Sequence, residues 1–500
     1  MTSPLIEFKE LSKAFGTNFA NREVTFSIQA GSFHGLAGEN GAGKSTVMKI
    51  LYGLISPDSG SLFFKGKRSH FRSPSDAIQA GLGMVHQHFK LVPTLSVWEN
   101  IILGKEPGPL FFNTDTIISS LDELQKQYGF HLPLTSRADS LSLGQQQQIE
   151  ILKLLYRQAE VLILDEPTAV LSPQEVEALF SQLSSLQSKN KTIIVVSHKL
   201  KEILKFTDVV TVMRQGRVVS TQPTQELNED TLASLIMGRH PLPLKRPPLA
   251  ATDKAVLSLE NVTTVKSPDR GLKNVSLEVK ESEIVGVAGI EGNGQSALVR
   301  VLAQIQKYQG LVTLLGQKLE EMSSYKRRQK GFGVIPPDRQ SEGLVLSFSN
   351  QLNFILGHHR EASFQSHGFY SSNRISAYSK QKMQEFGIHP PIPELKTSAL
   401  SGGNQQKLIV AREATPETRF LLACHPTRGV DIGAIEFIHS HFLNLKKQGA
   451  GILLISSELD ELLALSDRIL VIREGEIVFE TSTEKAEVKE LGLYMTGGKK

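Results

Sequence analysis

The chain has 500 residues, of which 40% are apolar, a formal net charge of +4 and a single cysteine. This length and apolar content suffice for two or more domains with buried cores. Its lysine and arginine residues are scattered rather than gathered in blocks, which argues against a nucleic-acid-binding protein, and one cysteine excludes an intrachain disulfide and fits a reducing compartment.

The N-terminal segment MTSPLIEFKE has no basic stretch followed by an apolar run, so we do not expect a signal peptide. The most apolar runs, VLIL at 161–164 and TIIVV at 192–196, are far shorter than the ~20 residues that a membrane-spanning helix needs. We interpret them as buried parallel strands. The chain is therefore expected to be soluble on its own, with any membrane role depending on partner subunits.

Three segments of the first half recur in the second half in the same order. They are GENGAGKS at 38–45 and GIEGNGQS at 289–296, LSLGQ at 141–145 and LSGGN at 400–404, and TDVVTVMRQGRVV at 207–219 and SDRILVIREGEIV at 466–478. Such ordered landmarks predict a duplicated domain.

We place the first domain at 1–240, a linker at 241–254 and the second domain at 255–500. The linker has four prolines between 241 and 248, which disfavour helix and central strand and predict a short, stiff connection. Within each half, aliphatic and β-branched runs alternate with helical stretches, the pattern of an α/β domain with a mainly parallel sheet.

In chain order, the first informative unit is a strand at 33–37, a glycine-rich loop and a helix at 45–54. The loop, GENGAGKST, matches the phosphate-binding pattern G-x-x-x-x-G-K-[ST]. Its glycines allow backbone N–H groups to curl around a triphosphate, and the helix presents its positive end to the anion. Lys44 would reach the β- and γ-phosphates, and the Ser45 hydroxyl would ligate Mg²⁺. The alternative is an ordinary glycine-rich turn before a helix. The residues assigned to ATP binding here are Gly38, Glu39, Asn40, Gly41, Ala42, Gly43, Lys44, Ser45 and Thr46.

Two stretches that follow, 94–105 and 115–130, are predicted to be helical and to form a separate helical subdomain. The segment VLILDEP at 161–167 is then predicted as a buried strand that ends in two carboxylates. Asp165 is placed to hold Mg²⁺ through water, and Glu166 is placed to orient or deprotonate an attacking water. Such a pair could also cap a helix or lie in a surface turn, but its position after a phosphate loop favours the catalytic interpretation.

LSLGQQQ at 141–147 resembles the signature LSGGQ of the ABC ATPase family, with Leu143 in place of the first signature glycine. The resemblance implies two tandem P-loop NTPase domains. Each would have a mainly parallel core sheet, an antiparallel β subdomain and a helical subdomain, and would bind ATP and Mg²⁺. In this family the signature serine and glycines contact the γ-phosphate of ATP that is bound to the opposite domain.

The resemblance assigns further roles in the first half. Gln87, in MVHQH, matches the Q-loop glutamine that binds Mg²⁺ and water and senses the membrane subunit. His198, in VVSHKL, matches the switch histidine; alone it would be an ordinary histidine, but its place after the strand at 192–196 favours the assignment. Phe15 is either the aromatic that stacks on adenine or a core side chain. The expected catalytic residues are Lys44, Gln87, Glu166 and His198, and the expected Mg²⁺ ligands are Ser45, Gln87 and Asp165.

The second half keeps the frame of these motifs but replaces their functional groups. Lys44 corresponds to Gln295, Asp165 and Glu166 to Cys424 and His425, and His198 to Ser457, while the stretch nearest to Gln87 in position offers Asp338 and Arg339. Each change removes a charge or polar group on which phosphoryl transfer depends. His425 could act as a base, but it lacks lysine and aspartate partners, so we favour a weak nucleotide-holding loop at 289–296.

The second signature, LSGGNQQK at 400–407, is by contrast close to the family pattern. Because ABC domains pair head to tail, each site joins one phosphate loop to the signature of the other half. The complete site would combine the first-half residues with Ser401, Gly402, Gly403 and Gln405. The degenerate site would combine Gly289, Gly294, Gln295 and Ser296 with Ser142 and Gly144. We therefore expect one hydrolytic site and one silent or structural site per chain.

Two fused domains with a degenerate second half look like the ATPases of bacterial simple-sugar and nucleoside importers, and the stretches 148–175, 343–349 and 400–439 are nearer to the nucleoside branch. The chain departs from the family at Pro337 and at the Cys424-His425 pair. The resemblance implies two membrane permease subunits and a substrate-binding protein or lipoprotein as partners, at the cytoplasmic face of the inner membrane. The segments near Gln87 and Asp338 would carry motion to the permeases, although LVPTLSVWEN at 91–100 is equally a packed helix start.

Two other interpretations remain. A soluble tandem ABC protein that acts on ribosomes or nucleic acid would be expected to have two intact sites, a long charged linker and basic extensions. Co-purification with ribosomes rather than membrane subunits would support it. A regulatory or structural pseudo-ATPase is the second, and measurable ATP turnover would exclude it.

Overall fold

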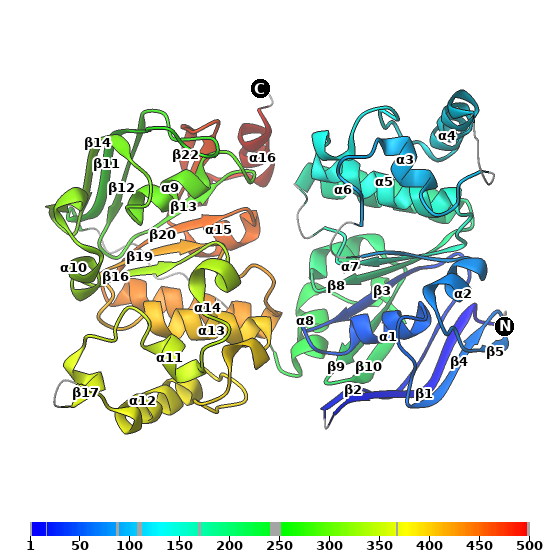
Figure 1. Cartoon of the computed structure of the whole chain (residues 1–500), viewed down its shortest axis with the longest axis horizontal. Helices are drawn as coiled ribbons and strands as arrows, with labels where there is room; N and C mark the ends of the chain where they lie inside the picture. The colour runs from blue at the N-terminus through cyan, green and yellow to red at the C-terminus, as the bar shows by residue number, and fades with distance from the viewer. Residues whose placement is uncertain are drawn as a thin grey trace. The chain divides into compact units, whose positions relative to one another are not determined.

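The computed structural model describes residues 3–16, 18–86, 90–107, 113–168, 171, 173–240, 252–366 and 369–497. The chain divides into two compact units, Met1–Pro241 and Leu242–Lys500 (Figure 1). Most of the predicted linker, at 241–251, lies outside the described residues. None of the helices in the described ranges combines the length and the apolarity that a membrane span requires.

The first unit contains both strands and helices throughout its length. Its strands are β1 (Ile6–Phe15), β2 (Asn18–Ile28), β3 (Phe33–Gly38), β4 (Ser59–Phe64), β5 (Lys67–Ser69), β6 (Leu82–Val85), β7 (Val161–Asp165), β8 (Thr192–Ser197), β9 (Val209–Arg214) and β10 (Arg217–Pro223). Its helices are α1 (Lys44–Leu51), α2 (Pro74–Gln79), α3 (Val97–Ile102), α4 (Thr114–Tyr128), α5 (Leu143–Tyr156), α6 (Pro173–Ser188), α7 (Leu200–Phe206) and α8 (Glu229–Met237).

Among the described residues of this unit, the core is a six-stranded sheet with the order β10-β9-β3-β8-β7-β6. Its strands are parallel except for β10, which pairs antiparallel with β9. A second, antiparallel sheet has the order β2-β1-β4-β5. Because β3, β8 and β7 are parallel neighbours, the segments that follow them emerge at one edge of the core sheet.

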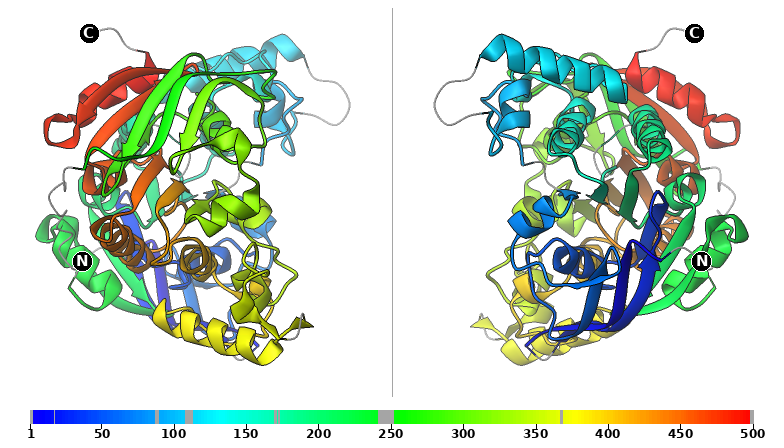
Figure 2. Two further views of the ribbon diagram at one scale, coloured as in Figure 1. Left: turned by 90° about the vertical axis from the view of Figure 1, so that its left-hand side faces the viewer. Right: turned by 90° about the vertical axis from the view of Figure 1, so that its right-hand side faces the viewer.

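The apolar side chains of β7 are buried on both faces of the core sheet. Val161 and Ile163 pack with the antiparallel sheet and α1, whereas Leu162 and Leu164 pack with the helices on the other side. Figure 2 shows these two sides of the first unit, with β1 and β2 in dark blue and α4 in cyan. Burial on both faces explains why the strand is apolar throughout instead of alternating.

The structure confirms the predicted helices and shortens them. The helix expected at 45–54 is α1, which ends at Leu51 because Gly53 has a φ of 73° and lies against Ser73. The helix expected at 94–105 is α3, which begins after Ser96, where Ser96 and Glu99 form a capping box. The helix expected at 115–130 is α4, which ends at Gly129 in the left-handed conformation.

The second unit repeats this architecture. Its strands are β11 (Ala255–Thr264), β12 (Val275–Lys280), β13 (Ile284–Ala288), β14 (Tyr308–Leu314), β15 (Gln317–Lys318), β16 (Phe332–Ile335), β17 (Gln365–Ser366), β18 (Phe369–Tyr370), β19 (Phe420–Cys424), β20 (Gly451–Ser456), β21 (Arg468–Arg473) and β22 (Glu476–Ser482). Its helices are α9 (Gln295–Leu302), α10 (Ser324–Gln329), α11 (Asn350–Phe354), α12 (Ser372–Glu385), α13 (Gly402–Glu413), α14 (Ile432–Lys447), α15 (Leu459–Leu465) and α16 (Val488–Thr496).

Its core sheet has the order β16-β19-β20-β13-β21-β22, which is the order of the first unit with each strand replaced by its counterpart, and its antiparallel sheet has the order β12-β11-β14-β15. The predicted architecture is therefore confirmed for both units. Each has a mainly parallel core sheet, an antiparallel β subdomain and a helical subdomain.

The second unit also contains a buried ionic cluster at the end of α13. The Glu413 carboxylate accepts hydrogen bonds from Arg328 Nη1 at 2.8 Å and from Arg412 Nε at 2.7 Å. Burial opposes ionisation, but the charges of Arg412 and Arg328 outweigh it and hold the pKa of Glu413 below its usual range. Because the pKa is lower in the folded chain, the cluster stabilises the fold above the usual glutamate pKa of ~4.3, and this stabilisation is lost as the pH falls.

Replacing Glu413 with glutamine should lower the free energy of unfolding by about 3 kcal/mol at pH 7, because the buried Arg412 and the partly buried Arg328 lose their counter-charge. The difference from wild type should shrink at a pH of about 3, where wild type begins to lose the same charge, because the pKa of Glu413 lies below its usual range. Urea unfolding at both pH values measures this. The control is Glu385→Gln, which removes a carboxylate from an exposed pair with Lys382 and should change the stability by no more than about 1 kcal/mol. Equal effects of the two variants would contradict the prediction.

Candidate functional site

The loop between β3 and α1 requires glycine at defined positions. Gly38, Gly41 and Gly43 have φ values of 155°, 82° and 98°. A Cβ atom on Gly38 would lie 2.3 Å from the Met213 carbonyl oxygen, and one on Gly43 would lie 2.3 Å from that of Ala20. At Gly38 and Gly43 the backbone is therefore packed directly against its neighbours, and no larger residue fits.

Lys44 follows this loop directly, as the first residue of α1. Its side chain is buried, and Nζ donates hydrogen bonds to the carbonyl oxygens of Gly38 at 2.7 Å and Glu39 at 2.9 Å. The ammonium group thus lies beside the loop backbone at the start of α1, where it can neutralise a bound polyphosphate. Asn40 and Gly41 are exposed at the tip of the loop, and Ser45 and Thr46 are partly buried in the first turn of the helix.

The hydroxyl of Ser45 and the carboxylate of Asp165 meet beside this helix. Ser45 Oγ donates to Asp165 Oδ1 at 3.3 Å, although the two residues are 120 positions apart. Burial, and then the neighbouring carboxylate of Glu166, raise the pKa of Asp165. A hydroxyl and a carboxylate are hard oxygen ligands, so this pair fits Mg²⁺. An added cation would relieve the repulsion between the two carboxylates.

Glu166 and His198 form the second close pair at this edge. His198 Nδ1 lies 3.1 Å from Glu166 Oε1, and both side chains are mostly buried. Burial opposes ionisation of Glu166, but the hydrogen bond and charge of His198, with Lys44, lower its pKa overall. Glu166 is therefore ionised at neutral pH and can orient a water molecule and accept its proton.

The backbone at Glu166 has a φ of 49°, in the left-handed region that a glutamate rarely adopts. Its N–H donates to the carbonyl oxygen of Val196 at 2.9 Å, so β8 holds the residue in this conformation. Strain of this kind is typical of functional positions.

Glu202, which was not predicted from the sequence, supports the two segments that contain the predicted catalytic residues Glu166 and His198. This buried carboxylate accepts hydrogen bonds from Thr168 Oγ1 at 2.9 Å and from Ser197 Oγ at 3.3 Å, so it joins the segments that follow β7 and β8. The internal repeat could have indicated this residue, because SHKLKE at 197–202 and the corresponding SSELDE at 456–461 both end in glutamate.

Two further candidate residues for contact with the nucleotide or the metal ion are Gln87 and Phe15. Gln87 lies outside the described residues. Phe15 is 55% exposed, with Lys13 Nζ 5.8 Å from the centre of its ring. The core alternative for Phe15 is therefore wrong, and its exposed face is available to stack on a planar ligand.

The corresponding loop of the second unit keeps its conformation without the cation. Gly292 and Gly294 have φ values of 92° and 117°. Gln295 is buried like Lys44, and its Nε2 donates to the Ile290 carbonyl oxygen at 2.9 Å while its Oε1 accepts from the Asn293 N–H at 3.1 Å. A Cβ on Gly289 would lie 2.4 Å from this Nε2. The amide thus fills the loop, with Ser296 next to it on α9, but supplies no charge.

Cys424 and His425 occupy the positions of the two carboxylates. The φ of His425 is 46°, and its N–H donates to the Ile455 carbonyl oxygen at 2.8 Å, as at Glu166. Burial raises the pKa of the Cys424 thiol, and burial followed by the charge of Arg428 lowers the pKa of His425. Both groups are neutral at pH 7, and the side chain of Ser457 is exposed. The second unit thus retains the backbone geometry seen at Glu166, but its side chains at these positions have different acid–base properties.

The thiol of Cys424 should be unreactive in the folded chain. It is the sole cysteine, is 2% exposed and has a raised pKa, so the thiolate is scarce and shielded. Reaction with Ellman's reagent should be about 10³- to 10⁴-fold slower than in urea, because exposure requires an opening that costs ~5 kcal/mol. Fast reaction of the native chain would show that β19 opens easily.

In the second unit, the segment at the position of the Q-loop is hydrogen-bonded to the loop that follows β19. Asp338 accepts from the N–H groups of Gln340 and Ser341, at 2.8 and 3.2 Å, and starts the π-helical turn Arg339–Gly343. Arg339 Nη1 donates to the Arg428 carbonyl oxygen at 2.6 Å. These residues hold the loop after β16 against the loop after β19.

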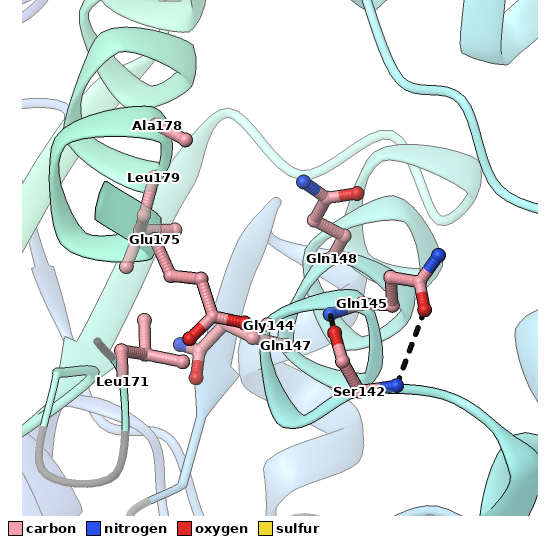
Figure 3. Close-up of a pocket in the computed structure, with 9 residues that line it drawn as sticks. All are labelled: Ser142, Gly144, Gln145, Gln147, Gln148, Leu171, Glu175, Ala178 and Leu179. Atoms are coloured by element: carbon pink, nitrogen blue, oxygen red, sulfur yellow. Dashed lines mark hydrogen bonds between the residues drawn. The ribbon is translucent and has the colours of Figure 1, made fainter. Parts of the chain in front are cut away.

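Each signature segment starts a helix. Ser142 caps α5 in a capping box with Gln145, and Leu143, which replaces the family glycine, is 40% exposed. Figure 3 shows Glu175 extending from α6 toward Gly144, beside a cavity of about 150 Å³. A Cβ on Gly144 would lie 2.7 Å from Glu175 Oε1, so glycine allows this close approach.

Ser401 is the N-cap of α13, where its hydroxyl accepts a hydrogen bond from the Asn404 N–H at 3.4 Å, and its side chain is exposed. A Cβ on Gly402 would lie 2.7 Å from Arg339 Nη2, and one on Gly403 would lie 2.8 Å from Asp431 Oδ2. Gln405 is buried and donates to the carbonyl oxygens of Leu400 and Thr397, at 3.2 and 3.3 Å. Its amide therefore supports the signature segment from inside.

Comparison with known proteins supplies a family context. The sequence profile of a family described as "ABC transporter" matches residues 21–169 and 272–428, which together are more than half of the chain. The two matches contain both phosphate-type loops and both signatures.

Three curated proteins are similar over nearly the whole chain. A glucose import ATP-binding protein of Haloferax volcanii is 40% identical, with 99% of this chain and 96% of that protein covered. A nucleoside import ATP-binding protein of Lactococcus lactis is 39% identical, with 99% and 98% covered. A guanosine import ATP-binding protein of Bacillus subtilis is 40% identical, with 99% and 97% covered.

Proposed function

The chain belongs to the ABC transporter family as a tandem ABC ATPase, and we propose that it is the ATP-hydrolysing subunit of an importer for nucleosides or simple sugars. The names of the similar proteins include import of glucose, of nucleosides and of guanosine, which supports cargo of this class. We propose one hydrolytic site and one degenerate site per chain. The observation that carries this is the contrast between the two units, which have the same backbone at the site and different functional groups.

In the proposed reaction, Lys44 and the backbone N–H groups of the loop bind the β- and γ-phosphates, and Glu166 orients the attacking water and takes its proton. His198 holds the Glu166 carboxylate in place by the 3.1 Å contact and lies beside the γ-phosphate. Ser45 and Asp165, with Gln87, would hold Mg²⁺. That ion, when bound, neutralises charge on the phosphates.

The second unit is proposed to complete this site by supplying its signature. Its own loop has no lysine and its strand β19 ends without a carboxylate, yet its signature keeps both glycines and an exposed Ser401. Head-to-tail pairing would bring Ser401, Gly402 and Gly403 to ATP held by the first unit. The altered signature at Leu143 would face the loop of Gln295, and this second site would be idle.

We propose two membrane permease subunits and a substrate-binding protein or lipoprotein as partners, with this chain bound peripherally at the cytoplasmic face of the membrane. The test is reconstitution in proteoliposomes with candidate permease subunits, followed by measurement of ATP hydrolysis and of nucleoside or simple-sugar uptake. Uptake that requires ATP supports the proposal. Purification of the chain with ribosomes, and absence of a complex with permeases, would overturn it.

A further inference from the structure

We propose that Asn21 is a positioning residue for nucleotide binding by the first unit. Its side-chain amide fixes the peptide between Gly43 and Lys44, so that the Lys44 N–H is aimed at the bound phosphates. This inference rests on the proposed function in one respect, which is that the loop at 38–46 binds ATP.

Asn21 is on β2, directly beneath the loop. Its side chain is fully buried, and Nδ2 donates to the Gly43 carbonyl oxygen at 3.1 Å. The contact is tight, because a Cβ atom on Gly43 would lie 2.5 Å from this Nδ2. Glycine at position 43 therefore leaves the space that the Asn21 amide occupies.

The effect on the loop follows from peptide geometry. In a planar trans peptide the C=O and the next N–H point in opposite directions. The Gly43 oxygen accepts from the Val47 N–H at 3.1 Å within α1 and from Asn21 outside it. Two donors in different directions fix the orientation of this peptide plane, so the Lys44 N–H is held toward the side of the loop where an anion binds at a helix N-terminus.

The second unit provides an internal comparison. There the loop keeps its other supports: Gly475 N donates to the Asn293 oxygen at 2.9 Å, as Gly216 N donates to the Ala42 oxygen at 3.1 Å in the first unit. The position of Asn21 is taken by Leu272, which is 1% exposed and has no donor. The additional hydrogen bond thus occurs in the unit that has Lys44, and an apolar residue replaces it in the unit that has Gln295.

Stability gives no reason for asparagine at this position. Its Oδ1 is buried without a hydrogen-bond partner in the described part of the chain. An unsatisfied buried acceptor costs about 1–3 kcal/mol, which offsets the gain from the hydrogen bond to Gly43. Leucine, as at 272, would avoid this cost. The residue is therefore better explained by what its amide does for the loop.

The test uses the full chain assembled with its permeases and compares Asn21→Leu with wild type. We expect the KM for ATP to rise about 5- to 10-fold, the effect of one hydrogen bond worth ~1–1.5 kcal/mol. The kcat should stay within about two-fold, because the N–H contacts phosphate before and during the reaction. The Tm should be unchanged or higher. Leu272→Asn, the matched change in the second unit, should leave the KM unchanged.

A second variant and a direct binding measurement keep the outcomes distinct. Asn21→Asp retains the shape but not the amide donor, so it should share the raised KM even if Asn21→Leu folds poorly. Titration with a fluorescent ATP analogue measures affinity whether or not turnover occurs. Equal affinity of wild type and both variants would overturn the role of Asn21, whereas a wild-type complex that binds the analogue without turnover would overturn only the proposed hydrolysis.

Discussion

Replacing Glu166 with glutamine should reduce ATP turnover of the assembled transporter by at least about 100-fold, within the range for loss of a general base. The carboxylate is ionised at neutral pH because His198 and Lys44 lower its pKa against the effect of burial. Glutamine retains the size and the polar contact to His198 but cannot accept a proton. ATP binding should therefore persist, and phosphate release measured against analogue binding separates the two effects.

The matched control is in the second unit. Gln295→Ala removes a side chain from the equivalent loop and should leave most of the turnover, because that loop is proposed to be idle. His425→Gln, at the position equivalent to Glu166, should do the same. If Gln295→Ala is as damaging as Glu166→Gln, the assignment of one hydrolytic site is wrong.

Replacing Lys44 with glutamine should reduce both ATP affinity and turnover by about 100-fold, since a charged donor to the phosphates is lost. This change installs the residue that the second unit has at Gln295, where glutamine fits the same loop by bonding to Ile290. The fold should therefore be retained, and the loss can be attributed to the charge. Analogue titration and phosphate release measure the two quantities, with circular dichroism as the check on folding.

The reverse change, Gln295→Lys, should not create a second hydrolytic site. Cys424 would still stand where the metal ligand is needed, and burial keeps its thiol protonated and neutral at pH 7. A doubling of turnover by Gln295→Lys would contradict this prediction. More than half of the wild-type turnover in Lys44→Gln would contradict the prediction for Lys44.

Much of the fold could be predicted because its signals are local. The apolar run VLIL became β7, buried on both faces, and the glycine-rich loop between β3 and α1 has the positive φ angles that its glycines allow. Helix ends were less accurate, and α1 is three residues shorter at its C-terminus than predicted. Its end depends on Gly53 packing against Ser73, a contact that spacing alone does not reveal.

Residues that support the site from neighbouring elements were not predicted either, because their contacts are between segments far apart in the sequence. Asn21 and Glu202 have no motif of their own, and each acts on partners brought near by the fold. Asn21 reaches Gly43 because β2 passes beneath the loop, and Glu202 joins Thr168 to Ser197 because β7 and β8 are neighbours. Comparison of the two halves could have suggested both residues. Asn21 corresponds to the apolar Leu272, whereas Glu202 corresponds to another glutamate, Glu461.

The amino-acid sequence alone was enough to establish the duplication and the α/β class, and to predict which half has the groups for phosphoryl transfer. These properties depend on residue type and short-range spacing, which local backbone geometry converts directly into loops and strands. The ionisation of Glu166, the pairing of Ser45 with Asp165 over 120 positions and the neutral state of Cys424 and His425 were decided by the tertiary structure. Electrostatic energies depend on distance in space and on burial, and neither is determined by distance along the chain.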